Sequence, residues 1–198
     1  MRLCAIALAA LLPSLAAGPD NIQGNAFGNP GAPIRIEVFS DFQCPACKRL
    51  HEEELPMIMK DFVNTGKVYV IYRYFPLPMH AYARPAAELV CAAAQLGKYR
   101  EAADALFARQ SSWSVDGKVE EAVASVLTAP QRMKLKALVK DAAVQRQING
   151  DIEEGGAVPV KGTPTLLVTY GIKRYPLSGE GALNYRLLKS FLDGLLSK

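Results

Sequence analysis

The chain has 198 residues, half of them hydrophobic, which is enough for one domain with a sizeable core or one domain that carries an insertion. The formal net charge is +4 and the sequence pI is about 8.9, but Lys and Arg are scattered among Asp and Glu and form no basic run. This pattern gives no support to nucleic-acid binding, which needs a concentrated basic surface.

Residues 1–17 have the pattern of a secretory signal peptide. A short positive start, Met1-Arg2, precedes an apolar run from Leu3 to Leu12, and small residues end the segment at Ala17. The run is shorter than the roughly 20 residues of a transmembrane helix, and an uncleaved anchor is the alternative. We therefore expect a periplasmic or secreted protein, in a compartment where disulfides persist. Without Cys4, which lies in this segment, the cysteines that remain are Cys44, Cys47 and Cys91.

The part of the chain that follows predicts a leader and then a β-α-β unit. Residues 18–33 are rich in Gly, Asn and Pro and predict a linker or loosely held leader. Ile34 to Ser40 is a nearly continuous apolar run, typical of a strand buried on both faces. A helix is predicted from about Cys44 to Val63, with a kink at Pro56. Lys67 to Phe75 is the next strand, and this order favours a parallel pair.

Residues 78–157 predict a block of helices, because they are rich in alanine and contain no convincing strand. We expect the last of these helices to end before Gly150, and Gly155-Gly156 to break the helical run. The predicted helices are Pro85 to Leu96, Lys98 to Arg109, Val119 to Leu127 and Pro130 to Ile148.

The end of the chain returns to strands. Thr165 to Tyr170 and Lys173 to Leu177 predict an antiparallel hairpin, and an amphipathic helix is expected from Ala182 to Leu196. The skeleton is therefore a small mixed α/β sheet flanked by helices, with the helical block inserted in its middle.

The segment "SDFQCPACKRL" places two cysteines at the start of a helix. The first N–H groups of a helix have no backbone partner and its dipole is positive at this end, so the Cys44 thiolate is favoured and its pKa should be low. Pro45 fits the first helical turn, where its missing N–H costs nothing. Cys47 lies one turn further on and should be less exposed. Cys44 would then attack, and Cys47 would resolve the mixed disulfide.

Two other readings of the pair are open. A zinc site needs about four ligands, and the chain has one such cysteine pair with His51 and His80 standing apart from each other. A purely structural disulfide is possible in an exported protein, but so small a loop adds little stability.

The segments "FSDFQCPACKRL" and "VKGTPTLLV" together resemble the DsbA-like branch of the thioredoxin superfamily. The resemblance covers nearly all of residues 32–198, including "PLPMHAYARPAAELVCAAAQLGKY" at the entry to the helical block. It implies a thioredoxin-like domain at 34–198 with the helical insertion at about 78–157. It also implies a cis peptide bond between Thr163 and Pro164, facing the dithiol, with the Thr163 backbone exposed for strand-like pairing with a bound polypeptide.

Two further residues bear on the chemistry that this resemblance implies. Strongly oxidising members of the family have His where this chain has Ala46, so we expect a less oxidising dithiol here. Glu37, in the strand before the dithiol, matches a buried acid that helps proton transfer to the second cysteine, Cys47; a solvent-facing strand residue is the alternative. Cys91, on an alanine-rich helix, is expected to be buried and inert.

The resulting hypothesis is an exported thiol:disulfide oxidoreductase that oxidises cysteine pairs of exported proteins through Cys44 and Cys47, with Thr163, Pro164 and Glu37 in support. Its partners would be exported proteins with free thiols and a membrane protein that restores the disulfide. No metal or organic cofactor is implied, and we expect a monomer. The alternatives are a thioredoxin-like reductant fed by a membrane reductase and a non-catalytic peptide-binding module of the same fold.

Overall fold

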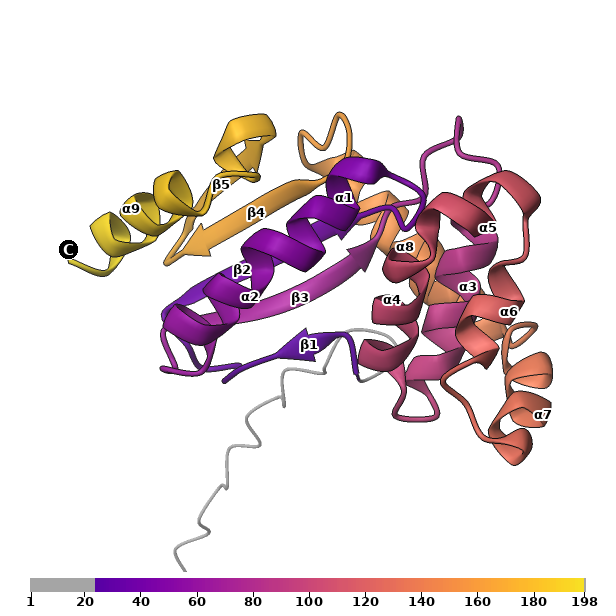
Figure 1. Cartoon of the computed structure of the whole chain (residues 1–198). Coiled ribbons are helices and arrows are strands. Elements are labelled where there is room, and N and C mark those ends of the chain that lie inside the picture. Colours follow the sequence, from indigo (N-terminus) through magenta and orange to yellow (C-terminus); the bar gives the residue numbers. More distant parts are fainter. Residues whose placement is uncertain (1–23, 198) are drawn as a thin grey trace, which may run out of the picture.

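The computed structural model describes residues 24–197, so the predicted signal peptide lies outside the described residues. The described part forms a five-stranded sheet in the order β1-β3-β2-β4-β5. Helices lie across the sheet, and a helical block gathers beside one end of it (Figure 1). Within residues 24–197, the structure has no helix with the length and apolar character to cross a membrane.

The centre of the sheet is the parallel pair of β2 (Ile34–Ser40) and β3 (Val68–Tyr74). The bounds of β2 are those that the sequence predicts. Ile34, Ile36 and Val38 are fully buried and pack with residues of the crossover helix and of the last helix of the chain. Since side chains alternate along a strand, Arg35, Glu37 and Phe39 face the opposite side of the sheet.

The crossover between β2 and β3 is helical, but its hydrogen bonding is not uniform. It consists of α1 (Pro45–Arg49), a π-helical segment η1 (Leu50–Glu54), α2 (Leu55–Ile58) and a second π-helical segment η2 (Met59–Val63). The sequence predicts one helix with a kink at Pro56. Pro56, near the start of α2, has no N–H to donate to the preceding turn. The wider η1 turn lies directly before α2, at the place where this hydrogen bond is missing.

The leader is not loosely held where the structure describes it. β1 (Ala26–Phe27) pairs with β3 in the antiparallel sense, and the Phe27 ring packs on Tyr72 with 6.0 Å between ring centroids. Asn25 is buried and its side chain donates to the Tyr72 carbonyl at 2.8 Å. These contacts are long-range and leave no local pattern in the sequence. The local abundance of Gly, Asn and Pro therefore predicts a linker.

The elements of the structure between residues 78 and 157 are helices. The first begins two residues before its predicted start, and the second agrees within a residue of its prediction. A short helix, α5, was not predicted. The bounds are α3 Ala83–Ala94, α4 Tyr99–Ala108, α5 Gln110–Asp116, α6 Val119–Ala124, α7 Ala129–Leu138 and α8 Ala142–Ala157.

The predictions for the last part of this block were wrong in two respects. The predicted helix from Pro130 to Ile148 is two helices, because Asp141 caps a new one by accepting a bond from the Ala143 N–H. Gly150 and Gly155-Gly156 do not end this helix but lie inside α8. Gly155 is required by close packing, since a Cβ there would lie 2.4 Å from a ring carbon of Phe75.

The chain ends in the predicted hairpin and helix. β4 (Thr165–Tyr170) and β5 (Lys173–Ser178) are antiparallel, and β4 also pairs with β2. A short 3-10 turn, Gly179–Gly181, precedes α9 (Tyr185–Leu196). The helix begins three residues after its predicted start because the Asn184 side chain caps it by accepting from the Leu187 N–H.

Candidate active site

The two cysteines lie where β2 passes into α1. Cys44 is the N-cap residue of α1, in an extended conformation, and Pro45 occupies the first helical turn. Both cysteines are free thiols in this structure. The exposed fraction is 7% for Cys44 and 1% for Cys47, so an attacking sulfur can reach Cys44 more easily.

The surroundings of Cys44 favour its thiolate. Hydrogen bonding from Cys47 lowers the pKa of Cys44 to about 5, with help from Thr163 and from the N–H groups of Cys47 and Ala46, although burial acts in the opposite direction. A thiol with so low a pKa is deprotonated at neutral pH and is also a good leaving group from a disulfide.

Cys47 has the opposite character. Burial, together with its contact with Cys44, raises the pKa of Cys47 well above its ordinary value. The Asp41 N–H donates to its sulfur at 3.4 Å, and Ser40 offers a further hydrogen bond that favours the thiolate. The pair is therefore asymmetric: an accessible thiolate lies beside a buried thiol.

The Thr163–Pro164 peptide bond is cis and lies against Cys44. The Cys44 sulfur lies 3.4 Å from the Thr163 carbonyl oxygen, although 119 residues separate the two in sequence. A groove of about 370 Å³ begins here, and residues beside both the dithiol and the cis bond line it, among them Ala46, Thr163 and Pro164. The structure thus joins the two sequence motifs in one site with an open groove beside them.

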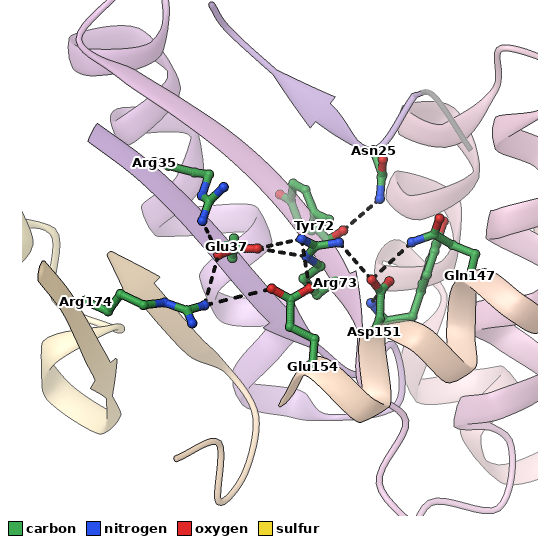
Figure 2. A network of polar contacts seen from close by, with 10 residues as sticks. Asn25, Arg35, Glu37, Tyr72, Arg73, Gln147, Asp151, Glu154 and Arg174 are labelled. Atoms are coloured by element: carbon green, nitrogen blue, oxygen red, sulfur yellow. Dashed lines mark hydrogen bonds and ion pairs between the residues drawn. The ribbon is translucent and has the colours of Figure 1, made fainter. Parts of the chain in front are cut away.

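Glu37 is fully buried, and its carboxylate belongs to an ionic network on the other face of the sheet (Figure 2). It accepts from the Arg73 guanidinium at 2.6 and 3.1 Å, and Arg35 and Arg174 lie 3.4 and 3.6 Å away. The solvent-facing alternative does not apply, since the side chain has no exposed surface.

The same network reaches the helical insertion through Arg73. This side chain donates to Asp151 at 3.1 Å and lies 2.9 Å from Glu154, both on α8 (Figure 2). Asp151 also accepts from the Tyr74 N–H at 3.0 Å. Burial raises the pKa of Asp151, against the effect of these donors. The network is therefore an ionic contact between the sheet and α8.

Asp41 is a site residue that the sequence analysis missed. Its buried carboxylate accepts from the N–H groups of Gln43 at 2.7 Å and Leu77 at 2.8 Å, and lies 2.7 Å from Nδ1 of His80. The bond to Gln43 is a local Asx turn, which "DFQ" signals in the sequence. The contact with His80 spans 39 residues and leaves no such signal.

Cys91 is buried, as predicted, in the hydrophobic cluster that also contains the dithiol. It is fully buried on α3, and burial raises the pKa of its thiol to about 12. Among residues 24–197, no group of three or more His, Cys, Asp and Glu side chains is arranged to hold a metal ion.

The Thioredoxin family model matches residues 20–184. The chain belongs to the thioredoxin family. Its fold is the DsbA-like one with a helical insertion, as the resemblance predicted. BdbD from Bacillus subtilis superposes with a TM-score of 0.72 at 21% identity, over 90% of this chain and 96% of that one. DsbA from Chlamydia trachomatis superposes with a TM-score of 0.71 at 20% identity, over 96% of this chain and 98% of that one.

Curated relatives of this thioredoxin-family chain match it with only part of their length. Disulfide bond formation protein D of Bacillus subtilis is 36% identical over 52 residues, which are 26% of this chain and 23% of that protein. The Na(+)/H(+) antiporter NhaA 3 of Salinispora tropica is 28% identical over 171 residues, which are 83% of this chain and 24% of the antiporter. The chain therefore spans about a quarter of the length of these relatives.

Proposed function

We propose that this protein is an exported thiol:disulfide oxidoreductase that oxidises cysteine pairs of exported proteins. The observation that carries the proposal is the asymmetry of the dithiol: the pKa of Cys44 is lowered to about 5 while that of Cys47 is raised. A stabilised Cys44 thiolate favours the reduced dithiol, and a protein that favours its reduced form oxidises its substrates.

The reaction is two successive thiol–disulfide exchanges. A substrate thiolate attacks the sulfur of Cys44 in the Cys44–Cys47 disulfide; a mixed disulfide forms, and Cys47 leaves as a thiolate that takes up a proton. A second substrate thiolate then attacks the substrate sulfur of the mixed disulfide. Cys44 leaves as its stable thiolate, the substrate disulfide forms, and two electrons have passed to the dithiol.

The groove beside the cis bond suits an extended polypeptide substrate. In this proposal the backbone at Thr163 pairs with the substrate chain, and Pro164 and Ala46 form the surface on which the substrate cysteine approaches Cys44. Backbone pairing is independent of substrate side chains, which fits an enzyme that acts on many exported proteins.

Glu37 is proposed to assist proton transfer at Cys47. Its burial in the strand that leads to the dithiol supports this role, while its bonds to Arg73 hold the carboxylate on the far face of the sheet. The relay would therefore work through water or through a change in the Arg73 contact. A Glu37→Gln variant should slow the steps in which Cys47 gains or loses a proton and leave the Cys44 titration unchanged.

The partners are proposed from the chemistry. The reduced dithiol must pass its electrons to an oxidant, which we propose is a membrane protein, and substrates are exported proteins with free thiols. The likeness to disulfide bond formation protein D supports this direction of electron flow. We propose that the protein works as a monomer in the periplasm or outside the cell, after removal of residues 1–17.

The first test is the reduction potential of the Cys44–Cys47 pair, measured by equilibration in glutathione buffers, together with the Cys44 titration. An oxidant should give roughly −120 to −180 mV with a Cys44 pKa well below 7. A potential of about −270 mV would identify a reductant. A Cys44 pKa near about 8.5, with no turnover of a reduced substrate, would favour the peptide-binding module.

A further inference from the structure

α5 lies against the loop that carries Cys44, although the sequence of this helix, "QSSWSVD", is polar and no site motif marks it. Three of its bonds fix its place. The Trp113 indole N–H donates to the Leu106 carbonyl of α4 at 2.7 Å, and the Gln43 amide donates to the Ser114 carbonyl at 3.4 Å. The third is the bond of Gln110.

Gln110 bridges two carbonyls of the active-site loop, residues 41–44 between β2 and α1. Its side-chain Nε2 donates to the Phe42 carbonyl at 2.7 Å and to the Cys44 carbonyl at 3.0 Å. The side chain is buried, with 6% of the residue exposed. A buried amide without hydrogen-bond partners is unfavourable, so Gln110 favours the position of the loop in which both of these bonds are made.

The position of this loop decides what the Cys44 sulfur meets. Cys44 is extended, with φ −77° and ψ 122°, and this conformation turns its side chain toward the first turn of α1. There the N–H groups of Ala46 and Cys47 favour the thiolate. A rotation of the peptide group at Cys44 would move the sulfur away from these donors. The carbonyl of that peptide group accepts from the Cys47 and Lys48 N–H groups of α1 at 3.1 and 3.2 Å, and Gln110 adds a third bond from the insertion.

We propose that Gln110 is a positioning residue for the nucleophile: by bonding the carbonyls of Phe42 and Cys44 from the helical insertion, it keeps the Cys44 sulfur on the N–H groups of α1. The inference rests on the proposed function, since it concerns the reactivity of the same dithiol. It gives the insertion a part in the chemistry, because α5 reaches the catalytic loop from a segment 66 residues away in sequence.

The test is Gln110→Met, which keeps the length of the side chain and removes its donors. Gln147→Met is the matched control, because Gln147 is also a buried glutamine of the insertion and it donates to Asp151, outside the active-site loop. The reduced proteins are titrated by thiolate absorbance, and their alkylation by iodoacetamide is followed from roughly pH 4 to 8. Unfolding by urea measures the stability of each variant.

We expect Gln110→Met to raise the Cys44 pKa and to slow alkylation near about pH 4, below the wild-type pKa, by about three- to tenfold, the factor for half to one pKa unit. Gln147→Met should lower stability without moving the titration. An unmoved titration in Gln110→Met, with a loss of stability like that of the control, would overturn the inference. If Gln110→Met does not fold, Gln110→Asn, whose shorter amide cannot bridge both carbonyls, decides by the same readouts.

The wild type separates this inference from the proposed function. A wild-type Cys44 with an ordinary pKa and no turnover removes the proposed function, and the inference with it. A reactive, low-pKa wild type whose Gln110→Met and Gln110→Asn variants keep the same profile leaves the proposed function in place and removes only the inference.

Discussion

Two polar regions connect the helical insertion to the sheet, and they are built differently. The loop region contains Asp41, Gln43 and Gln110, whose side chains bond mainly to backbone groups around the dithiol. The ionic region contains Glu37 and Arg73 with the carboxylates of α8. The first region fixes where a reacting sulfur lies. The second joins charged groups on the other face of the sheet, so changes there should affect stability and the proposed proton transfer at Cys47 but leave the Cys44 thiolate unchanged.

The largest effect should come from Arg73→Met in the ionic region. Loss of the guanidinium leaves Glu37 buried without its closest cation, and removal of one member of a buried pair costs about 3–5 kcal/mol. We expect a loss near the lower end of this range, since Arg35 and Arg174 also lie within 4 Å. Urea unfolding of the oxidised and the reduced protein should show the same loss in both.

The control for Arg73→Met is Lys136→Met, because Lys136 and Glu120 form an exposed ion pair at 3.9 Å, and its loss should cost less than about 1 kcal/mol. The Cys44 titration should be the same in both variants. A Cys44 pKa that moves with Arg73→Met would show that the two regions are coupled and that our division between them is wrong.

The Cys44 thiolate, which the loop region positions, should contribute stability only in the reduced protein and only in one pH range. The pKa of Cys44 is about 5 in the folded state against an ordinary 9.0, so below pH 5 the thiol is protonated in both states and contributes nothing. Between about pH 5 and 9 the folded state holds the thiolate and the unfolded state the thiol. The stabilisation therefore grows as pH rises through this range, by at most about 1.4 kcal/mol per pH unit.

Above about pH 9 Cys44 is a thiolate in both states, so its gain stops, and the raised pKa of Cys47 then lowers the stability of the reduced protein. The measurement is the free energy of unfolding of the reduced protein minus that of the oxidised protein, at roughly pH 5, 6.5 and 8. In the wild type this difference should rise across the series. The control compares two variants that cannot form the Cys44–Cys47 disulfide: the free energy of unfolding of Cys44→Ser minus that of the double variant Cys44→Ser,Cys47→Ser should stay level. A level difference in the wild type would mean that Cys44 is not a stabilised thiolate.

A smaller effect should come from Gly155→Ala, where α8 meets the sheet beside the ionic region. The new Cβ would lie 2.4 Å from a ring carbon of Phe75 and 3.2 Å from one of Phe39, and such overpacking costs about 1–3 kcal/mol. Gly156→Ala is a control in the next position of the same helix. Its Cβ would have no atom within 4 Å, so it should stabilise the protein by about 0.5–1 kcal/mol. Opposite signs in urea unfolding would support the packing of α8; equal signs would contradict it.

The two regions also differ in how far the sequence predicts them. The dithiol and the Thr163-Pro164 pair are short motifs with local consequences, and the strand at Ile34–Ser40 has a nearly continuous apolar run. The sequence therefore predicts these features. Gln110 acts across 66 residues and lies in a helix that forms through the Trp113 bond and burial more than through its own polar sequence. No local pattern predicts such an element.

The helical insertion shows the same limit at its helix ends. A glycine usually ends a helix, and this rule placed the end of α8 before Gly150. The structure continues the helix because Gly155 allows it to approach Phe75, which is a tertiary reason. Asp141, in contrast, starts α8 through its own side chain. Such a cap is a local signal, but the apolar periodicity around it favoured one continuous helix.

The smallest effect should come from Ala46→His, which adds to the loop region the residue that the strongly oxidising family members have there. A protonated imidazole beside the groove would favour the Cys44 thiolate, so the Cys44 pKa should fall by less than about one unit and the potential should become more oxidising. Ala46→Gln, polar but without charge, is the control. The effect should fade above about pH 7, where the imidazole loses its proton, and should shrink at high salt. An equal shift of the Cys44 pKa in Ala46→Gln, or a shift that is independent of pH and salt, would contradict this. The Cys44 pKa would then respond to packing in the groove and not to charge at position 46.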